Sequence, residues 1–205
     1  LVELTGARYH LGQVSTAAAL DIIAQAKARG LPVTCAVSAH HLVLNEQDIG
    51  EYKTFAKVSP ALRTEDDRKA LVEGVRAGTI DAIVSSHDPQ APETKRLPFA
   101  QAAYGAVGLE TLLPAALSLH HEANVPLIEV LRRLTLAPAN LLRVGSGRLT
   151  KGAPADLILF DPSAPRKIDP ADFRSRSKNS PFKGRLMQGR VSRTVVAGTT
   201  VFQTA

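Results

Sequence analysis

Polar side chains able to bind a metal or move a proton lie at or just after the C-terminal ends of three short apolar segments of this 205-residue sequence. Imidazole and carboxylate groups at the ends of parallel strands are typical of a metal centre or a general base. A hydrolytic zinc centre usually takes about three such protein ligands. The polar residues at the three ends are His10, Gln13, Ser38, His40, His41, Ser86, His87, Asp88 and Gln90.

The same residues also allow structural interpretations. His10 lies inside its apolar segment, where a core or barrel-lining histidine is as good an interpretation as a ligand. We expect His40 and His41 to lie on an extended segment, so that they point to opposite sides and only one faces a common site. Asp88 precedes Pro89, which keeps it extended and favours a turn or a backbone hydrogen bond for its carboxylate.

The first two segments belong to a strand–helix–strand pattern. Residues 8–14 are predicted to form a short strand. Ser15 and Thr16 then cap a helix whose apolar residues recur at helical spacing until Gly30. Residues 31–37 form the next predicted strand, and this order implies a parallel pair.

The pattern continues towards residue 143. A helix over residues 65–77 precedes a mostly apolar strand at 80–85, typical of a strand buried on both faces. The polar segment between residues 38 and 64 is expected to contain one more short strand near 54–58. Further helices are predicted at 108–121, 126–134 and 138–142.

The pattern changes near Gly145. Short segments at 147–149, 156–160 and 193–202 alternate like antiparallel strands, the last with a turn at Gly198. We therefore expect an α/β part over residues 1–143 and a mostly β part over residues 144–205. A closed (β/α)₈ barrel takes ~250 residues, so the first part would be a piece of a barrel. The chain opens on Leu1 without a cap, which favours a fragment whose N-terminal half is missing.

Composition restricts the class of protein. Hydrophobic residues make up 44% and charged residues 21% of the chain, which suits a packed globular domain. No apolar run reaches the ~20 residues that span a bilayer. Cys35 is the single cysteine, so neither an internal disulfide nor a four-thiolate zinc site can form, and a cytoplasmic location is expected.

The net charge of +6 does not indicate nucleic-acid binding. Lysine and arginine are spread along the chain, and three Tyr, six Phe and no Trp leave few rings for stacking on bases. The charge suits an acidic protein partner or an anionic metabolite instead.

Seven short motifs together are similar to those of one family. Tyr-His-Leu-Gly-Gln-Val-Ser-Thr at residues 9–16 resembles Tyr-His-x-x-His-Ile/Val-Ser-Thr, and Ser-Ser-His-Asp-Pro-Gln at 85–90 resembles Thr-Asp-His-Ala-Pro-His. The chain is thereby identified as resembling the dihydroorotases of the amidohydrolase superfamily, of the multifunctional-complex type. The other matching motifs lie at 37–42, 57–68, 108–111, 147–157 and 179–184.

The resemblance implies a (β/α)₈ TIM barrel with a small β-sandwich built from both chain ends. This chain would supply barrel strands five to eight and the C-terminal return of the sandwich. The family reversibly cyclises carbamoyl aspartate to dihydroorotate at a zinc centre, in pyrimidine biosynthesis. The resemblance also implies an oligomer, and as partners the missing N-terminal half and aspartate transcarbamoylase, with neither nucleic acid nor membrane.

Four positions depart from the family's pattern. Gln13 stands where the family has a zinc-binding histidine, and Ser86 where it has the aspartate that touches the metal and moves the proton. A neutral amide is a poor zinc ligand, and a serine hydroxyl lacks carboxylate basicity. Ser59 and Gln90 replace a substrate-binding asparagine and histidine.

The His40-His41 pair, which supplies a zinc ligand in the family, is kept, and His87 is a further pocket position. Two interpretations remain open. The favoured one is a catalytically impaired homologue, or a non-catalytic scaffold partner of aspartate transcarbamoylase, with no metal expected from this half and no convincing catalytic residue. The alternative is an active, metal-dependent cyclic-amide hydrolase that uses zinc and ligands from the N-terminal half.

Overall fold

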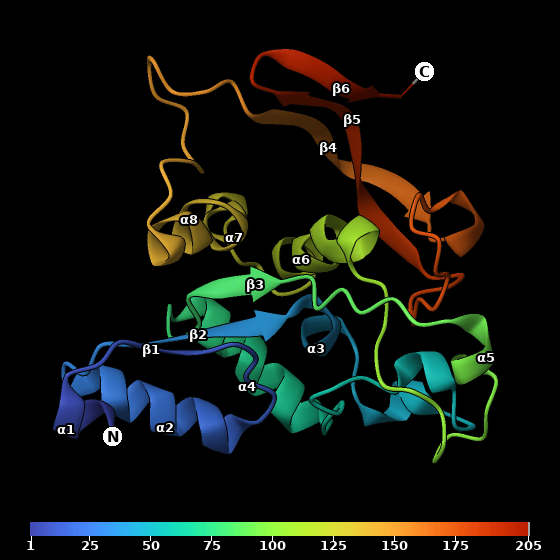
Figure 1. Ribbon diagram of the computed structural model, residues 1–205, viewed down its shortest axis with the longest axis horizontal. Coiled ribbons are helices and arrows are strands. Elements are labelled where there is room, and N and C mark those ends of the chain that lie inside the picture. Colours follow the sequence, from blue (N-terminus) through green and yellow to red (C-terminus); the bar gives the residue numbers. More distant parts are fainter. Residues whose placement is uncertain (205) are drawn as a thin grey trace.

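The computed structural model describes residues 1–204 and contains two three-stranded sheets (Figure 1). The first sheet is parallel, with the order β1 (Tyr9–Leu11), β2 (Val33–Ser38), β3 (Ala82–Val84). The second is antiparallel, with the order β4 (Leu157–Lys167), β5 (Leu186–Val196), β6 (Thr199–Gln203). Figure 1 shows α2 (Ala17–Ala28) and α4 (Glu65–Arg76) along one side of the parallel sheet. It shows α6 (Leu112–His121), α7 (Leu127–Leu134) and α8 (Leu136–Leu142) between the two sheets.

The first strand–helix–strand unit is confirmed. Helix α2 (Ala17–Ala28) begins where the Thr16 hydroxyl oxygen accepts a hydrogen bond from the Ala19 N–H at 3.2 Å. Gly30, with φ +73°, reverses the chain into β2, because a residue without Cβ adopts this conformation at little cost. Strands β1 and β2 then pair in parallel.

Helix α4 (Glu65–Arg76) packs closely on α2. A Cβ at Gly74 would lie 2.6 Å from Leu20 Cδ2, so any larger residue here would force the end of the Leu20 side chain to shift. The Asp67 carboxylate accepts the free Ala17 N–H at 2.8 Å, which joins the N-terminal ends of the two helices. The helices α2 and α4, which are separate along the chain, therefore pack side by side in one layer.

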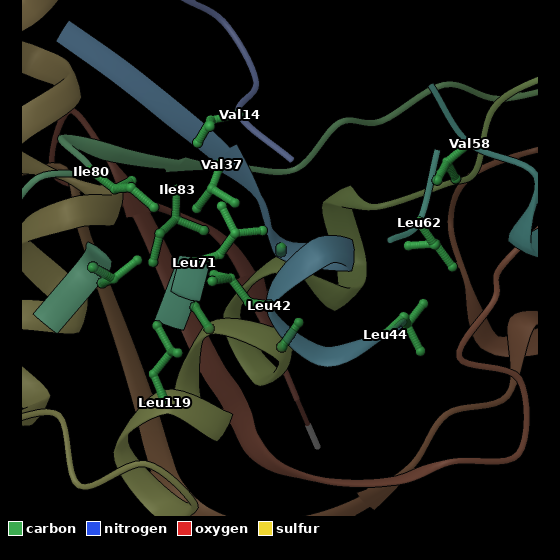
Figure 2. Packing of buried hydrophobic residues seen from close by; sticks show 14 of the residues in the cluster. Val14, Val37, Leu42, Leu44, Val58, Leu62, Leu71, Ile80, Ile83 and Leu119 are labelled. Atoms are coloured by element: carbon green, nitrogen blue, oxygen red, sulfur yellow. The ribbon is translucent and has the colours of Figure 1, made fainter. Parts of the chain in front are cut away.

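The apolar core lies between the parallel sheet and its surrounding helices. Figure 2 shows valine, leucine and isoleucine side chains from β2, β3, α3 (Ala39–Val43), α4 and α6 packed against one another. Val37, Leu71 and Leu119 are each at most 1% exposed. Cys35 is fully buried in the same core, as its place in an apolar strand predicts.

Two predicted strands are wrong. Residues 54–56 form the 3₁₀ turn η2 (Thr54–Ala56), because the Lys57 N–H bonds the Thr54 carbonyl within the turn at 3.0 Å. Residues 147–149 form no strand, since Gly147 has φ +80°, outside the extended region. The Gly198 turn is confirmed, but β4 and β5 are each longer than predicted, with eleven residues.

The remaining elements are short and mostly connect the two sheets. No helix within residues 1–204 is long and apolar enough to cross a membrane. These elements are α1 (Val2–Thr5), α3 (Ala39–Val43), η1 (Glu46–Ile49), α5 (Pro92–Lys95), η3 (Leu109–Thr111), α6 (Leu112–His121), α7 (Leu127–Leu134), α8 (Leu136–Leu142) and η4 (Pro170–Asp172).

Candidate functional site

The C-terminal ends of β1, β2 and β3 lie side by side, as parallel pairing requires. Leu11 pairs with Cys35, and Ser38 pairs with Val84. A further parallel bridge joins His87, beyond β3, to Ala106. The segments that follow the three strands therefore start from one edge of the sheet, where α/β proteins place their functional groups.

His40 is held at the start of α3. Ser38 is the N-cap of this helix, and its hydroxyl oxygen accepts the His40 N–H at 3.1 Å and lies 3.2 Å from His40 Nδ1. The imidazole stacks on the Phe182 ring, with centroids 5.6 Å apart and planes 26° apart. Its Nε2 atom is buried without a hydrogen-bond partner.

His41 is oriented from the opposite direction. Its Nε2 lies 3.1 Å from the Pro60 carbonyl oxygen and 3.2 Å from that of Ala61. Carbonyl oxygens only accept hydrogen bonds, so Nε2 carries the proton and Nδ1 keeps a lone pair. That Nδ1 is buried without a partner.

The two histidines lie in a helical turn and not on an extended segment, which corrects the expected geometry. Both side chains are buried, at 1% and 2% exposure. Burial, together with the neighbouring His41, lowers the pKa of His40 to about 4. Burial also lowers the pKa of His41, against its carbonyl hydrogen bonds. Both imidazoles are therefore neutral at pH 7.

His87 is oriented by the backbone that follows Val107. Its Nδ1 accepts the Gly108 N–H at 3.1 Å, which places the ring proton on Nε2 in this arrangement. A Cβ at Gly108 would overlap the Ser85 carbonyl oxygen and lie 3.2 Å from His40 Cε1. Glycine at this position thus lets the backbone pass between the end of β3 and His40.

Ser86 and Asp88, after β3, and Ser59, in the loop before it, each have a different environment. Ser86 has φ +46°, in the left-handed region. The exposed carboxylate of Asp88 accepts a hydrogen bond from the Gln90 side-chain amide at 2.7 Å, so it bonds a side chain and not the backbone as predicted. Ser59 is exposed.

His10 and Gln13, near the end of β1, differ in exposure. His10 is exposed and so is not a core histidine, and its Nδ1 lies 2.9 Å from Thr34 Oγ1 on the neighbouring strand. Gln13 is half-buried, and its Oε1 atom has no hydrogen-bond partner. A buried amide oxygen without a donor is costly, so this position invites a ligand or a further segment of protein.

Two residues from the C-terminal part support the site, and the sequence interpretation assigned neither a role in it. Phe182 stacks on His40, and the buried Asn179 amide donates to the carbonyl oxygens of Gly105 at 3.1 Å and Asp88 at 3.3 Å. Both belong to the Asn-Ser-Pro-Phe motif, whose match to the family was the available signal.

The donor set does not fit a zinc ion held by these residues alone. Within residues 1–204, no three His, Cys, Asp or Glu side chains are placed to share a metal ion. His40 and His41 could each offer one nitrogen, but Gln13 offers a neutral amide and Ser86 a hydroxyl. A zinc centre here would need ligands from outside these residues.

Comparison with known proteins supports a relation along nearly the whole chain. The model of the amidohydrolase family matches residues 3–201. The dihydroorotase of Anaplasma phagocytophilum is 49% identical over 203 residues, which cover 99% of this chain and 45% of that protein. The chain thus spans about half the length of the curated relatives it matches.

Solved structures of other proteins share the α/β fold of this chain. The L-hydantoinase of Arthrobacter aurescens superposes with a TM-score of 0.93 at 30% identity, over 98% of this chain and 46% of that one. An inactive dihydroorotase-like domain of a Chaetomium thermophilum CAD-like multifunctional protein superposes with a TM-score of 0.72 at 21% identity, over 100% of this chain and 55% of that one. The chain belongs to the amidohydrolase family.

Proposed function

We propose that this chain forms strands five to eight of a dihydroorotase-like (β/α)₈ barrel, over residues 1–143, and part of a β-sandwich, over residues 144–205. The parallel order β1-β2-β3 and the parallel bridge beyond β3 support the barrel. The antiparallel sheet β4-β5-β6 supports the sandwich. An N-terminal half of the same protein would supply the other strands.

The proposed barrel has lost the zinc chemistry of a cyclic-amide hydrolase, or keeps little of it. The observation that carries this proposal is the pair Gln13 and Ser86, at positions where related enzymes use a zinc-binding histidine and a proton-transferring aspartate. An amide and a hydroxyl stay neutral at pH 7 and supply neither strong ligation nor basicity. The substitutions Ser59 and Gln90 extend the change to the substrate pocket.

The remaining role is that of a scaffold within an assembly of pyrimidine biosynthesis, with aspartate transcarbamoylase as the proposed partner. Charge supports a protein partner. Residues 144–205 hold eleven Lys and Arg against four Asp, whereas residues 1–143 hold fourteen against fifteen acidic residues. Among the described residues, the one cation of 144–204 that forms an ion pair is Arg185, with Asp48 at 3.9 Å. This excess of free cations suits an acidic surface.

The alternative, an active metal-dependent cyclic-amide hydrolase, is favoured by two observations. Relatives at 42–49% identity carry the name dihydroorotase. His40 and His41 also present buried nitrogens without partners, as ligands awaiting a metal would. In this alternative the N-terminal half supplies the missing ligands.

Zinc content and dihydroorotate turnover of the full-length protein separate the two functions. We expect less than stoichiometric zinc and no turnover. The variant Gln13→His, Ser86→Asp should gain zinc, and aspartate tolerates the left-handed φ at residue 86 better than most side chains. The control Gln25→His, Ser146→Asp makes the same exchanges at exposed positions and should gain none. Stoichiometric zinc and ordinary enzyme rates in the unmodified protein would establish the hydrolase.

The scaffold role has its own test. The full-length protein and aspartate transcarbamoylase should elute together in size-exclusion chromatography at micromolar concentration, and added salt should weaken the complex. Separate elution under low-salt conditions removes support for this partner.

A further inference from the structure

A cavity of about 790 Å³ opens beside the loops that follow β2 and β3. Its lining residues come from three regions that are distant in sequence: Asp48 with residues 53–56, residues 95–96, and residues 180–185. The volume lies within the range of small-molecule sites in proteins.

The wall of this cavity carries a large excess of positive charge. Asp48 is the one carboxylate among its lining residues, and it lies 3.9 Å from Arg185. The other cations of the wall form no ion pair with a described carboxylate. The five lining cations are Lys53, Lys95, Arg96, Lys183 and Arg185.

Lys95 is buried in the wall, at 3% exposure. Its ammonium donates to the carbonyl oxygens of Ala103 at 2.8 Å and Thr54 at 2.9 Å, with that of Lys57 at 3.4 Å. Carbonyl dipoles satisfy its hydrogen bonds, but they do not neutralise its charge.

Lys57 adds a second buried ammonium behind the same wall, at 8% exposure. It donates to the carbonyl oxygens of Phe99 and Ala102, each at 2.7 Å, and of Ala100 at 3.0 Å. Its carbonyl group is itself an acceptor for Lys95. The two lysines therefore join the loop after β2 to residues 99–103.

Burial of Lys95 makes its charged form costly. The pKa of Lys95 is lowered to about 8, mainly by burial; the charge of Asp88 opposes this shift, and that of Lys57 adds to it by a smaller amount. Burying like charges in a region of low dielectric is unfavourable, and a nearby anion relieves that cost.

We propose that this cavity binds a small phosphate-bearing anion. Arg96 and Arg185 present planar guanidinium groups that suit phosphate oxygens, and Lys53 and Lys183 add flexible point charges. The bound anion would connect the loop after β2, the end of α5 and the Ser180–Pro181 turn, which otherwise share an open cavity.

The test uses the full-length protein and inorganic pyrophosphate as the probe, with isothermal titration calorimetry at fixed physiological ionic strength. We expect saturable binding with one site per chain. The variant Arg96→Ala, Lys183→Ala removes two exposed charges from the cavity and should weaken binding at least about tenfold. The control Lys151→Ala, Arg193→Ala removes two exposed charges that do not line the cavity and should change affinity by less than about twofold.

Three results would overturn the proposal. Pyrophosphate could fail to saturate at millimolar concentration. The control variant could weaken binding as much as the cavity variant does, which would identify non-specific screening. Citrate could bind as tightly as pyrophosphate, which would exclude a preference for phosphate.

Discussion

Acidification should destabilise this protein through His40. The imidazole is 1% exposed, and burial lowers its pKa from 6.5 to about 4. In the unfolded chain the same imidazole takes up a proton near its ordinary pKa. Between these two values the unfolded state binds more protons than the folded state, so the free energy of unfolding must fall as the pH falls.

The size of the loss follows from the two pKa values. One pKa unit corresponds to about 1.4 kcal/mol, so the full shift is worth about 3 kcal/mol once the pH is below both values. About 2 kcal/mol of this should already be lost at about pH 5. A loss of this size is a large fraction of the stability of an ordinary domain.

Urea unfolding of the full-length protein at several pH values between neutral and mildly acidic measures this loss. The variant His40→Gln cannot take up the proton and should lose about 2 kcal/mol less than the wild type on acidification to about pH 5. The exposed His10→Gln variant serves as the control and should follow the wild type. An identical loss in the wild type and in His40→Gln would refute the reasoning.

Three further substitutions test particular contacts by urea unfolding. Lys57→Met should cost about 2–4 kcal/mol, because it leaves the buried carbonyl groups that accept from Lys57 without a donor, whereas the exposed Lys69→Met should be nearly neutral. Gly108→Ala should cost about 1–3 kcal/mol, because its added Cβ would overlap the Ser85 carbonyl oxygen. The control Gly145→Ala has no atom within 4 Å of its added Cβ and should change the stability little. Equal effects of the two variants would contradict the packing argument. Thr16→Ala should cost about 1 kcal/mol by removing the cap of α2, and an unchanged stability would show that the cap is dispensable.

Local signals predicted most of the helices and strands. Thr16 and Gly30 bracket α2 as expected, because capping and left-handed reversal depend on residues within one turn of the helix end. Local signals failed at residues 54–58, where Lys57 and Lys95 hold a turn through carbonyl groups about forty residues away. They also failed at His40 and His41, because Ser38 begins a helix directly at the end of β2.

The candidate site was only partly predictable. Its residues and the strand ends that carry them follow from apolar segments and motif matches. The partners of those residues do not, because the contact of Phe182 with His40 joins segments 142 positions apart and no local pattern records it.

The sequence by itself therefore determined the residue types, with an amide at residue 13 and a hydroxyl at residue 86, and the order of the first strand–helix–strand unit. The tertiary structure alone decided which nitrogens of His40 and His41 lack partners and where the cations of distant loops meet. The physical reason is that burial and pairing depend on which surfaces pack together, and packing is set by the whole chain at once.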